Sequence, residues 1–176
     1  MKFFVSAIFL STMMNSILIF DFKNNSDLSG WQVVDDVVMG GKSNGKLYLN
    51  SEGHGVFEGS VSLENNGGFS SIRYRIKSGQ TEGYSKAIIQ LKGDGKEYQF
   101  WVKLNQSDYY SYIINFNTTG DWQTLEIPLI EMYPSFRGRK LDLPNYAGET
   151  LREIAFLIGN KKQVTFKSMI DKIEPE

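Results

Sequence analysis

Polar and apolar residues alternate along much of this chain, and this period of two is the feature that most restricts its fold. In the segment 97–104 (EYQFWVKL), Tyr98, Phe100 and Val102 lie on one phase, and Trp101 lies among the polar residues on the other. Successive side chains of a β-strand point to opposite sides of a sheet, so this segment predicts a strand with one buried face. Strands are also predicted at 17–22, 46–50, 72–77, 110–116, 122–129, 152–158 and 163–170.

Turn signals separate these segments, because glycine adopts backbone conformations that other residues avoid and asparagine and aspartate favour turns. The sequence predicts structural turn residues at Gly40, Gly41, Gly67, Gly68, Gly93, Asp94 and Gly95. Many short strands joined by such turns, with no long helical pattern, indicate an all-β antiparallel sandwich or barrel. The segment 134–150 is expected to be a long irregular connection, and connections of this length are often functional.

The composition excludes several kinds of site. The 19 basic and 20 acidic residues give a net charge of -1, and no block of basic residues exists, so we expect no nucleic-acid partner. Cysteine is absent, which excludes disulfides, thiolate catalysis and zinc held by cysteine. His54 is the only histidine, so one chain cannot supply a two-histidine metal site. We expect neither a metal nor a cofactor.

The first residues resemble a secretory signal peptide, because Lys2 precedes an apolar stretch that carries no charge until Asp21. A membrane anchor is the alternative, since the stretch reaches the shortest length that spans a bilayer. Serine, threonine and asparagine within it favour the signal peptide. We expect a signal peptide over 1–16, a single domain over 17–174, and export to the periplasm or the cell exterior; without a signal peptide the location would be cytoplasmic. The mature chain is expected to be a monomer without a membrane span.

A set of separated motifs carries a family resemblance. Trp31 is followed by DDVVMGGKSNG (35–45) and GVFEGSVSLENNGGFSSIR (55–73), and FRGRKLD (136–142) and LREIAFLIGNK (151–161) come later. Together these motifs resemble the complex I intermediate-associated protein 30 family over nearly the whole chain. The resemblance implies a galactose-binding-like β-sandwich of jelly-roll type. The absence of a transit-like leader favours a minimal, bacterial member.

For the eukaryotic members of that family, the implied role is help in assembling respiratory complex I. We therefore predict a non-catalytic binding or assembly-factor domain that recognises protein partners. The alternative is a carbohydrate-binding module of the cell envelope, which the implied fold and the aromatic side chains on polar strand faces support by analogy. A hydrolase is the third possibility. The expected partner is a protein or a glycan.

Residues 35–45 predict a corner in which paired glycines allow a sharp turn. We expect Val37 and Met39 to turn inward while Asp35 and Asp36 stay near the rim. Two interpretations remain open: a fold-defining corner whose aspartates bond to nearby backbone amides, or a contact surface. The candidate contact residues are Asp35, Asp36, Lys42, Ser43 and Asn44.

A second candidate surface centres on Trp101, which shares the polar phase of its strand with Gln99 and Lys103. An aromatic side chain on a polar face can stack on a sugar ring or pack against a partner. We predict a single aromatic and basic patch that joins this strand to two neighbouring segments. Its members are Trp101, Arg73, Arg75, Arg137 and Arg139. The alternative is that the 134–150 segment covers Trp101.

Weaker signals would suit a hydrolase or a metal site. The segment 41–45 matches the pattern G-x-S-x-G, but a nucleophile elbow needs a helix after the serine, and 46–50 predicts a strand. Glu58 and Glu64 could form a glycosidase pair. Asp94 could bind calcium, although no EF-hand spacing surrounds it. The simpler interpretation makes all of these turn or surface residues.

Overall fold

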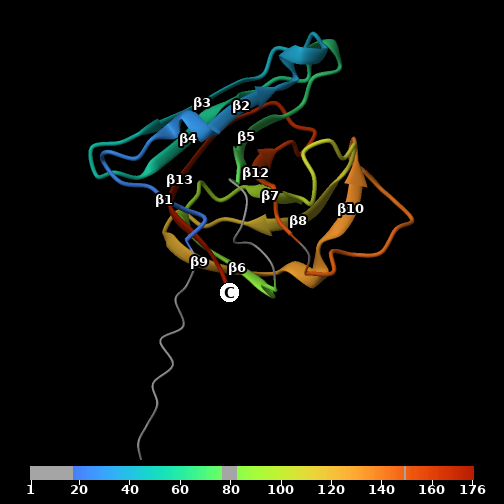
Figure 1. Cartoon of the computed structure of the whole chain (residues 1–176). Helices are drawn as coiled ribbons and strands as arrows, with labels where there is room; N and C mark the ends of the chain where they lie inside the picture. Colours follow the sequence, from blue (N-terminus) through green and yellow to red (C-terminus); the bar gives the residue numbers. More distant parts are fainter. Residues whose placement is uncertain (1–17, 77–82, 149) are drawn as a thin grey trace, which may run out of the picture.

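The computed structural model describes residues 18–76, 83–148 and 150–176, which form two antiparallel β-sheets packed face to face (Figure 1). The first sheet has the strand order β3-β4-β13-β6-β9, with β1 paired to β13. Its strands are β1 (Phe20–Asp21), β3 (Asn44–Leu49), β4 (Gly55–Val61), β6 (Lys86–Lys92), β9 (Trp122–Pro128) and β13 (Val164–Pro175). The second sheet has the order β11-β10-β8-β7-β12-β5-β2. Its strands are β2 (Trp31–Asp35), β5 (Ser70–Arg75), β7 (Glu97–Lys103), β8 (Ser111–Asn117), β10 (Tyr133–Phe136), β11 (Arg139–Lys140) and β12 (Glu153–Ile158).

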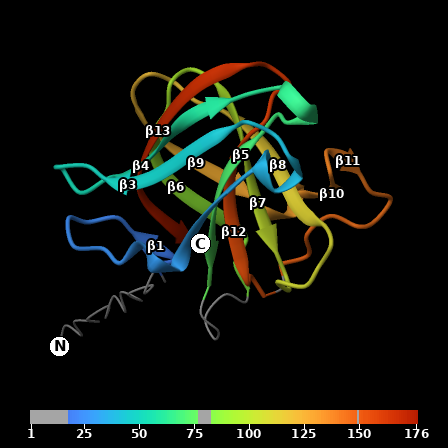
Figure 2. The same cartoon turned by 90° about the horizontal axis from the view of Figure 1, so that it is seen from above.

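The chain passes repeatedly from one sheet to the other, as between β5 and β6, β8 and β9, and β12 and β13 (Figure 2). Four short 3-10 turns lie in the connections between described strands: η1 (Leu28–Gly30), η2 (Asp36–Met39), η3 (Glu64–Asn66) and η4 (Leu129–Glu131). In the described ranges no α-helix forms, and none of the helical turns is long and apolar enough to cross a bilayer. The predicted all-β antiparallel sandwich is confirmed. The predicted signal peptide lies outside the described residues.

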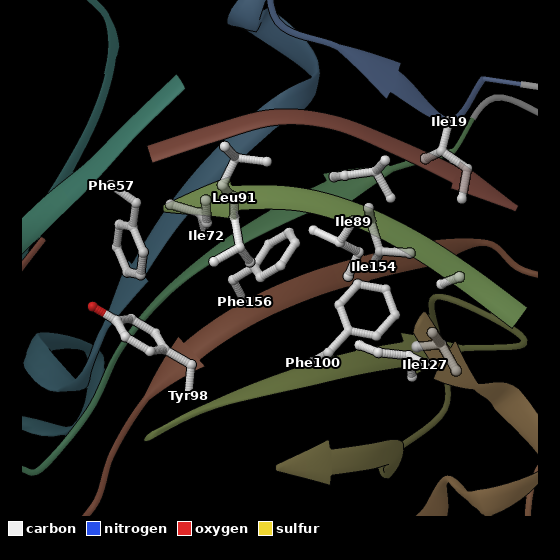
Figure 3. Close-up of a cluster of buried hydrophobic side chains, with 14 of the residues drawn as sticks. Ile19, Phe57, Ile72, Ile89, Leu91, Tyr98, Phe100, Ile127, Ile154 and Phe156 are labelled. Atoms are coloured by element: carbon white, nitrogen blue, oxygen red, sulfur yellow. The ribbon is translucent and has the colours of Figure 1, made fainter. Parts of the chain in front are cut away.

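The core lies between the sheets and follows the alternation in the sequence. Tyr98, Phe100 and Val102 of β7 are at most 2% exposed, as their phase predicts. Phe100 packs on Phe156 of β12, with ring centroids 5.3 Å apart. Figure 3 shows side chains of both sheets filling the space between them. Burial of each such side chain contributes about 1.5–3 kcal/mol, so the core fixes which face of β7 points to solvent.

Several strands were not predicted from the sequence. β2 (WQVVD), β4 (GVFEGSV) and β6 (KAIIQLK) were not among the predicted strands. β2 and β4 lack the clear polar and apolar alternation expected of a half-buried strand, whereas β6 alternates except at Ile88 and was overlooked. β4 contains Gly59, where a Cβ atom would collide with the backbone of Asn44 on β3, so this position needs a residue without a side chain. The first strand is short, only Phe20–Asp21, whereas β13 runs through Val164–Pro175 with a register shift between Ile170 and Lys172.

Candidate binding groove

The outward face of the second sheet brings together two members of the predicted patch. Trp101 of β7 pairs with Ala155 of β12, and Ala155 pairs with Arg73 of β5. Residues paired in this way point to the same side of a sheet, so the indole and the guanidinium lie on either side of one small side chain. The guanidinium carbon of Arg73 is 5.8 Å from the Trp101 ring centroid. The Trp101 indole nitrogen donates a hydrogen bond of 3.0 Å to the Gln99 side chain, which fixes the ring orientation.

These two side chains lie in a groove of about 580 Å³. Its floor is formed by residues of the second sheet that share the outward phase, namely Val34, Arg73, Gln99, Trp101, Lys103, Ser111, Ser135 and Leu157. Turns and strand ends close its sides with Met39, Leu63, Asn66, Gly67, Gly68, Phe69, Tyr109, Phe136, Arg137, Gly138, Gly159 and Lys161. A volume of this size suits a small ligand or a short segment of a chain molecule. Trp101 is half-buried, so the 134–150 segment does not cover it.

Tyr109 and Phe136 add an aromatic wall to the groove. Tyr109 precedes β8 and is 63% exposed. Its ring centroid lies 5.4 Å from that of Phe136, in the edge-to-face arrangement that aromatic pairs favour. Neither residue was a sequence candidate, because Tyr109 lies outside the alternating segment of β8 and Phe136 in the supposed loop. The tyrosine pair at 109–110, next to a turn, was the available signal.

The β10–β11 hairpin places Arg137 at the groove. Phe136 pairs with Arg139, so Arg137 and Gly138 form the turn, with φ angles of 50° and 74°. Positive φ at both central positions is the type I′ geometry that matches the twist of paired strands. The prediction of an irregular connection over 134–150 is therefore wrong at its start. The alternation of polar and apolar residues did not predict this hairpin, because Pro134 interrupts the first strand and both strands are short. Arg139 does not line the groove.

The corner at residues 35–45 builds one end of the groove around a buried carboxylate. Asp36 accepts hydrogen bonds from the backbone amides of Ser43 (2.9 Å), Gly68 (2.6 Å) and Phe69 (3.2 Å), and from the Ser43 hydroxyl. Burial would raise the pKa of this carboxyl, but the hydrogen bonds from Ser43, Gly68 and Phe69 together hold its pKa below the usual value. Asp36 therefore joins the corner to the turn before β5. That turn, with Met39 of the corner, lines the groove end.

The orientation of this corner is the reverse of the predicted one. Val37 and Met39 are 58% and 57% exposed, whereas Asp36 and Ser43 are buried. Burial of an apolar side chain contributes about 1.5–3 kcal/mol, and a hydrogen bond to a charged group contributes about 1.5–3 kcal/mol as well. Four such bonds reach one carboxylate here, so they outweigh the burial of two side chains. Asp36 and Ser43 hold the fold and are not accessible for contact.

The other corner candidates also lie outside the groove. Asp35 accepts hydrogen bonds from the Gly45 amide (2.9 Å) and the Ser70 hydroxyl (2.6 Å), so its carboxylate links β3 to β5. Lys42 is exposed and forms an ion pair with Glu64, and Asn44 is exposed at the start of β3. Of the predicted contact residues, Lys42 and Asn44 are exposed, Asp35 is partly exposed, and Asp36 and Ser43 are buried.

The predicted turn glycines act by two different means. Gly40 has a φ of 87° and ends η2 in the left-handed region, as expected. Gly41 does not have a positive φ; instead, a Cβ atom there would overlap the Asp36 carboxylate. Gly67 is similar, since its Cβ atom would lie 2.6 Å from Asp36 Oδ2. One glycine of each pair, Gly41 and Gly67, therefore lies directly against the same buried carboxylate.

Asp94 is a structural turn residue between β6 and β7. Its carboxylate accepts hydrogen bonds from the Lys96 ammonium (2.6 Å), the Lys167 amide (2.9 Å) and the Tyr98 hydroxyl (3.2 Å). These donors use the oxygen atoms that a calcium ion would need. The part of the chain that the structure describes has no group of three or more potential acidic or histidine metal ligands.

The hydrolase signals do not assemble into a catalytic geometry. Ser43 is buried and its hydroxyl bonds to Asp36, and a strand rather than a helix follows it. Glu58 forms ion pairs with two lysines of the first sheet, which lower its pKa to about 2, and Glu64 pairs with Lys42 elsewhere. His54 lies beside Trp122, with ring centroids 4.6 Å apart. None of these residues lines the groove.

The fold and the groove define a jelly-roll β-sandwich with a ligand-sized site on one sheet. The chain belongs to the family Complex I intermediate-associated protein 30 (CIA30), whose model matches residues 20–170. This confirms the family resemblance in the sequence.

Solved structures of carbohydrate-binding modules share this fold. A family 11 module of a cellulosomal cellulase from Clostridium thermocellum has 16% sequence identity and a TM-score of 0.66 over 91% of this chain and 93% of that one. Another structure of a Clostridium thermocellum family 11 module, in complex with a beta-1,3-1,4-mixed-linked tetrasaccharide, has 15% identity and a TM-score of 0.62 over 88% and 93%. A family 29 module complexed with mannohexaose has 11% identity and a TM-score of 0.56 over 91% and 92%. The jelly-roll prediction is confirmed.

Proposed function

We propose that this protein is a non-catalytic binding domain whose groove holds a segment of a carbohydrate chain. The observation that carries the proposal is the open groove with the half-buried indole of Trp101 on its floor and the exposed ring of Tyr109 on its wall. Sugars present apolar ring faces as well as hydroxyl groups, so they bind to aromatic surfaces flanked by hydrogen-bonding side chains. Gln99, Ser111 and Ser135 supply such groups on the same floor.

Two further points support the proposal. Two of the three structures named above were solved in complex with saccharides, although a shared fold alone does not establish a shared ligand. The described lining of the groove contains no carboxylate, histidine or cysteine, so it lacks the acid, base and nucleophile on which glycoside hydrolysis depends.

A glycan array probed with the full chain tests this proposal. Trp101→Ala should weaken binding of any captured saccharide by about 2 kcal/mol or more with little change in the melting temperature. Trp122→Ala is the matched control, because Trp122 is 45% exposed on β9 of the other sheet. Saccharide binding that survives Trp101→Ala and is lost with Trp122→Ala would place the site on the first sheet and contradict the proposal.

Protein recognition, the function predicted first from the family, is the second candidate. The observation that favours it is a pair of exposed apolar side chains that line the groove end, where Met39 and Leu63 are 57% and 44% exposed. Exposed apolar side chains that gather in one place mark interaction sites. An affinity pull-down with the wild type and the double variant Met39→Ser, Leu63→Ser separates the two candidates. A partner lost with the variant, together with an empty glycan array, would establish protein recognition.

A further inference from the structure

The groove is rich in cations and has no acid among its described lining residues. Arg73, Lys103, Arg137 and Lys161 line it, and the lining contains neither aspartate nor glutamate. The whole chain has a net charge of -1, so this excess is a property of one face. Clefts lined by one sign of charge attract ligands of the opposite sign.

A second hollow of about 700 Å³ continues this basic face beyond Arg73. Arg73 lines both cavities, and Arg75 and Arg152 join it in the second one, which also has no acid among its described lining residues. The predicted patch member Arg75 therefore lies beside the groove rather than inside it. Among the described residues, six basic and no acidic side chains line the two cavities: Arg73, Arg75, Lys103, Arg137, Arg152 and Lys161.

Arg73 is a donor without an acceptor. Its Nε atom is buried and has no hydrogen-bond partner among the described residues, and the same holds for the indole nitrogen of Trp31 in the second hollow. Burial lowers the pKa of Arg73, and the charge of Glu153 opposes this effect. Glu153 lies in register between Lys103 and Arg75 but forms no ion pair at contact distance with any described residue. A buried N–H group without a partner is unfavourable, and no hydrogen bond or ion pair to a described residue occupies the Arg73 guanidinium, so no acceptor of the described chain competes with a ligand for it.

Neutral and acidic sugars need different hydrogen-bonding groups in a binding site. A sugar hydroxyl donates as well as accepts, so neutral saccharides need acceptor groups in the protein. On the groove floor the Gln99 carbonyl oxygen already accepts from Trp101, which leaves the hydroxyls of Ser111 and Ser135 as side-chain acceptors.

A uronate carboxylate only accepts, and arginine binds it with two parallel hydrogen bonds. We infer that the groove is selective for acidic saccharides and recognises their uronate carboxylates through Arg73, Arg137 and Lys161. This inference rests on the proposed carbohydrate function.

Paired ligands test it with the full chain. Oligosaccharides of galacturonate, glucuronate, mannuronate and guluronate are each compared with their own methyl esters, which keep the sugar ring and remove the charge. At least one acid should bind about tenfold or more tightly than its ester, as expected for loss of a charged hydrogen bond. The advantage should fall as salt rises. Arg73→Gln and, separately, Arg137→Gln should reduce it. Arg139→Gln is the matched control for Arg137→Gln, since Arg139 is exposed in the same hairpin but outside the groove.

The outcomes separate this inference from the proposed function. Uronides that bind no better than their esters, while binding of either needs Trp101, would overturn the selectivity and leave carbohydrate binding intact. Failure of every charged and neutral saccharide would overturn both. A poly-glutamate peptide that binds as tightly as the best uronide, with the same dependence on Arg137, would assign the basic face to acidic peptides instead. If Arg73→Gln does not fold, the exposed pair at positions 137 and 139 still decides the result.

Discussion

Replacement of Asp36 by alanine should destabilise the domain more than any exposed substitution in the corner. The change removes a carboxylate that accepts from three backbone amides and one hydroxyl. Each buried donor left without a partner costs about 1–3 kcal/mol, and water entering the new space recovers part of this. We therefore expect Asp36→Ala to lower the free energy of unfolding by about 3–5 kcal/mol, as for other broken buried charge networks.

A graded series makes this expectation specific to the hydrogen bonds. Asp36 Oδ2 accepts from the Ser43 hydroxyl and from the amides of Gly68 and Phe69, whereas Oδ1 accepts only from the Ser43 amide. Asp36→Asn can place its amide oxygen at the Oδ2 position, where it still accepts three of the four hydrogen bonds, so we expect it to lose about half as much free energy, roughly 1.5–2.5 kcal/mol. Glu64→Ala is the control, because its ion pair with Lys42 is exposed and contributes at most about 1 kcal/mol.

Urea denaturation monitored by tryptophan fluorescence measures all three variants. The lowered pKa of Asp36 adds a pH dependence: its stabilisation is present at neutral pH and is lost as the pH falls through the folded-state value. The difference between wild type and Asp36→Ala should therefore shrink in acid. A difference below about 1 kcal/mol at pH 7, or one that grows in acid, would refute the role assigned to this carboxylate.

Three further predictions concern stability and processing. Gly41→Ala should lower the melting temperature because its Cβ atom would overlap the Asp36 carboxylate, while Gly40→Val should cost about 1–3 kcal/mol because a β-branched residue is strained at a φ of 87°; unchanged melting of both would contradict the corner geometry. Glu58→Gln should destabilise the protein slightly at pH 7 and progressively less toward pH 2, because the pKa of Glu58 is lowered to about 2; a pH-independent difference would show that its ion pairs are not formed. Mass spectrometry of the natural protein should find an exported chain starting near residue 17, and a cytoplasmic chain starting at Met1 would disprove the signal peptide.

The alternation in the sequence was sufficient for most of the strands that have one buried face, although β6 was overlooked. In β7, the phase of Phe100 and Trp101 correctly separated core from solvent because burial acts on every second residue. It was not sufficient for strands built from small residues, such as β4, or for the short β10–β11 hairpin around Arg137. Those elements depend on pairing with distant strands and on turn geometry, which local periodicity does not encode.

The candidate site was predictable to a similar degree. The polar phase put Trp101 and Arg73 on solvent-facing sides of their strands, but only the order of strands in the sheet puts β12, with its small Ala155, between them. The prediction for the corner at residues 35–45 was wrong for a different reason. Apolar residues such as Val37 were assumed to determine which side is buried, whereas the hydrogen-bonding requirement of Asp36 determined it.

The three tryptophans of this chain offer the most direct test of the groove as the binding site. In a 15N-labelled sample titrated with the tightest saccharide from the array, each indole N–H gives its own resonance. The Trp101 signal should shift and saturate with the ligand, because its indole lies on the groove floor. The Trp122 signal should stay in place, since that residue is on the other sheet. A saturable shift of Trp122 with Trp101 unmoved, or no saccharide able to move either signal, would contradict carbohydrate binding in the groove.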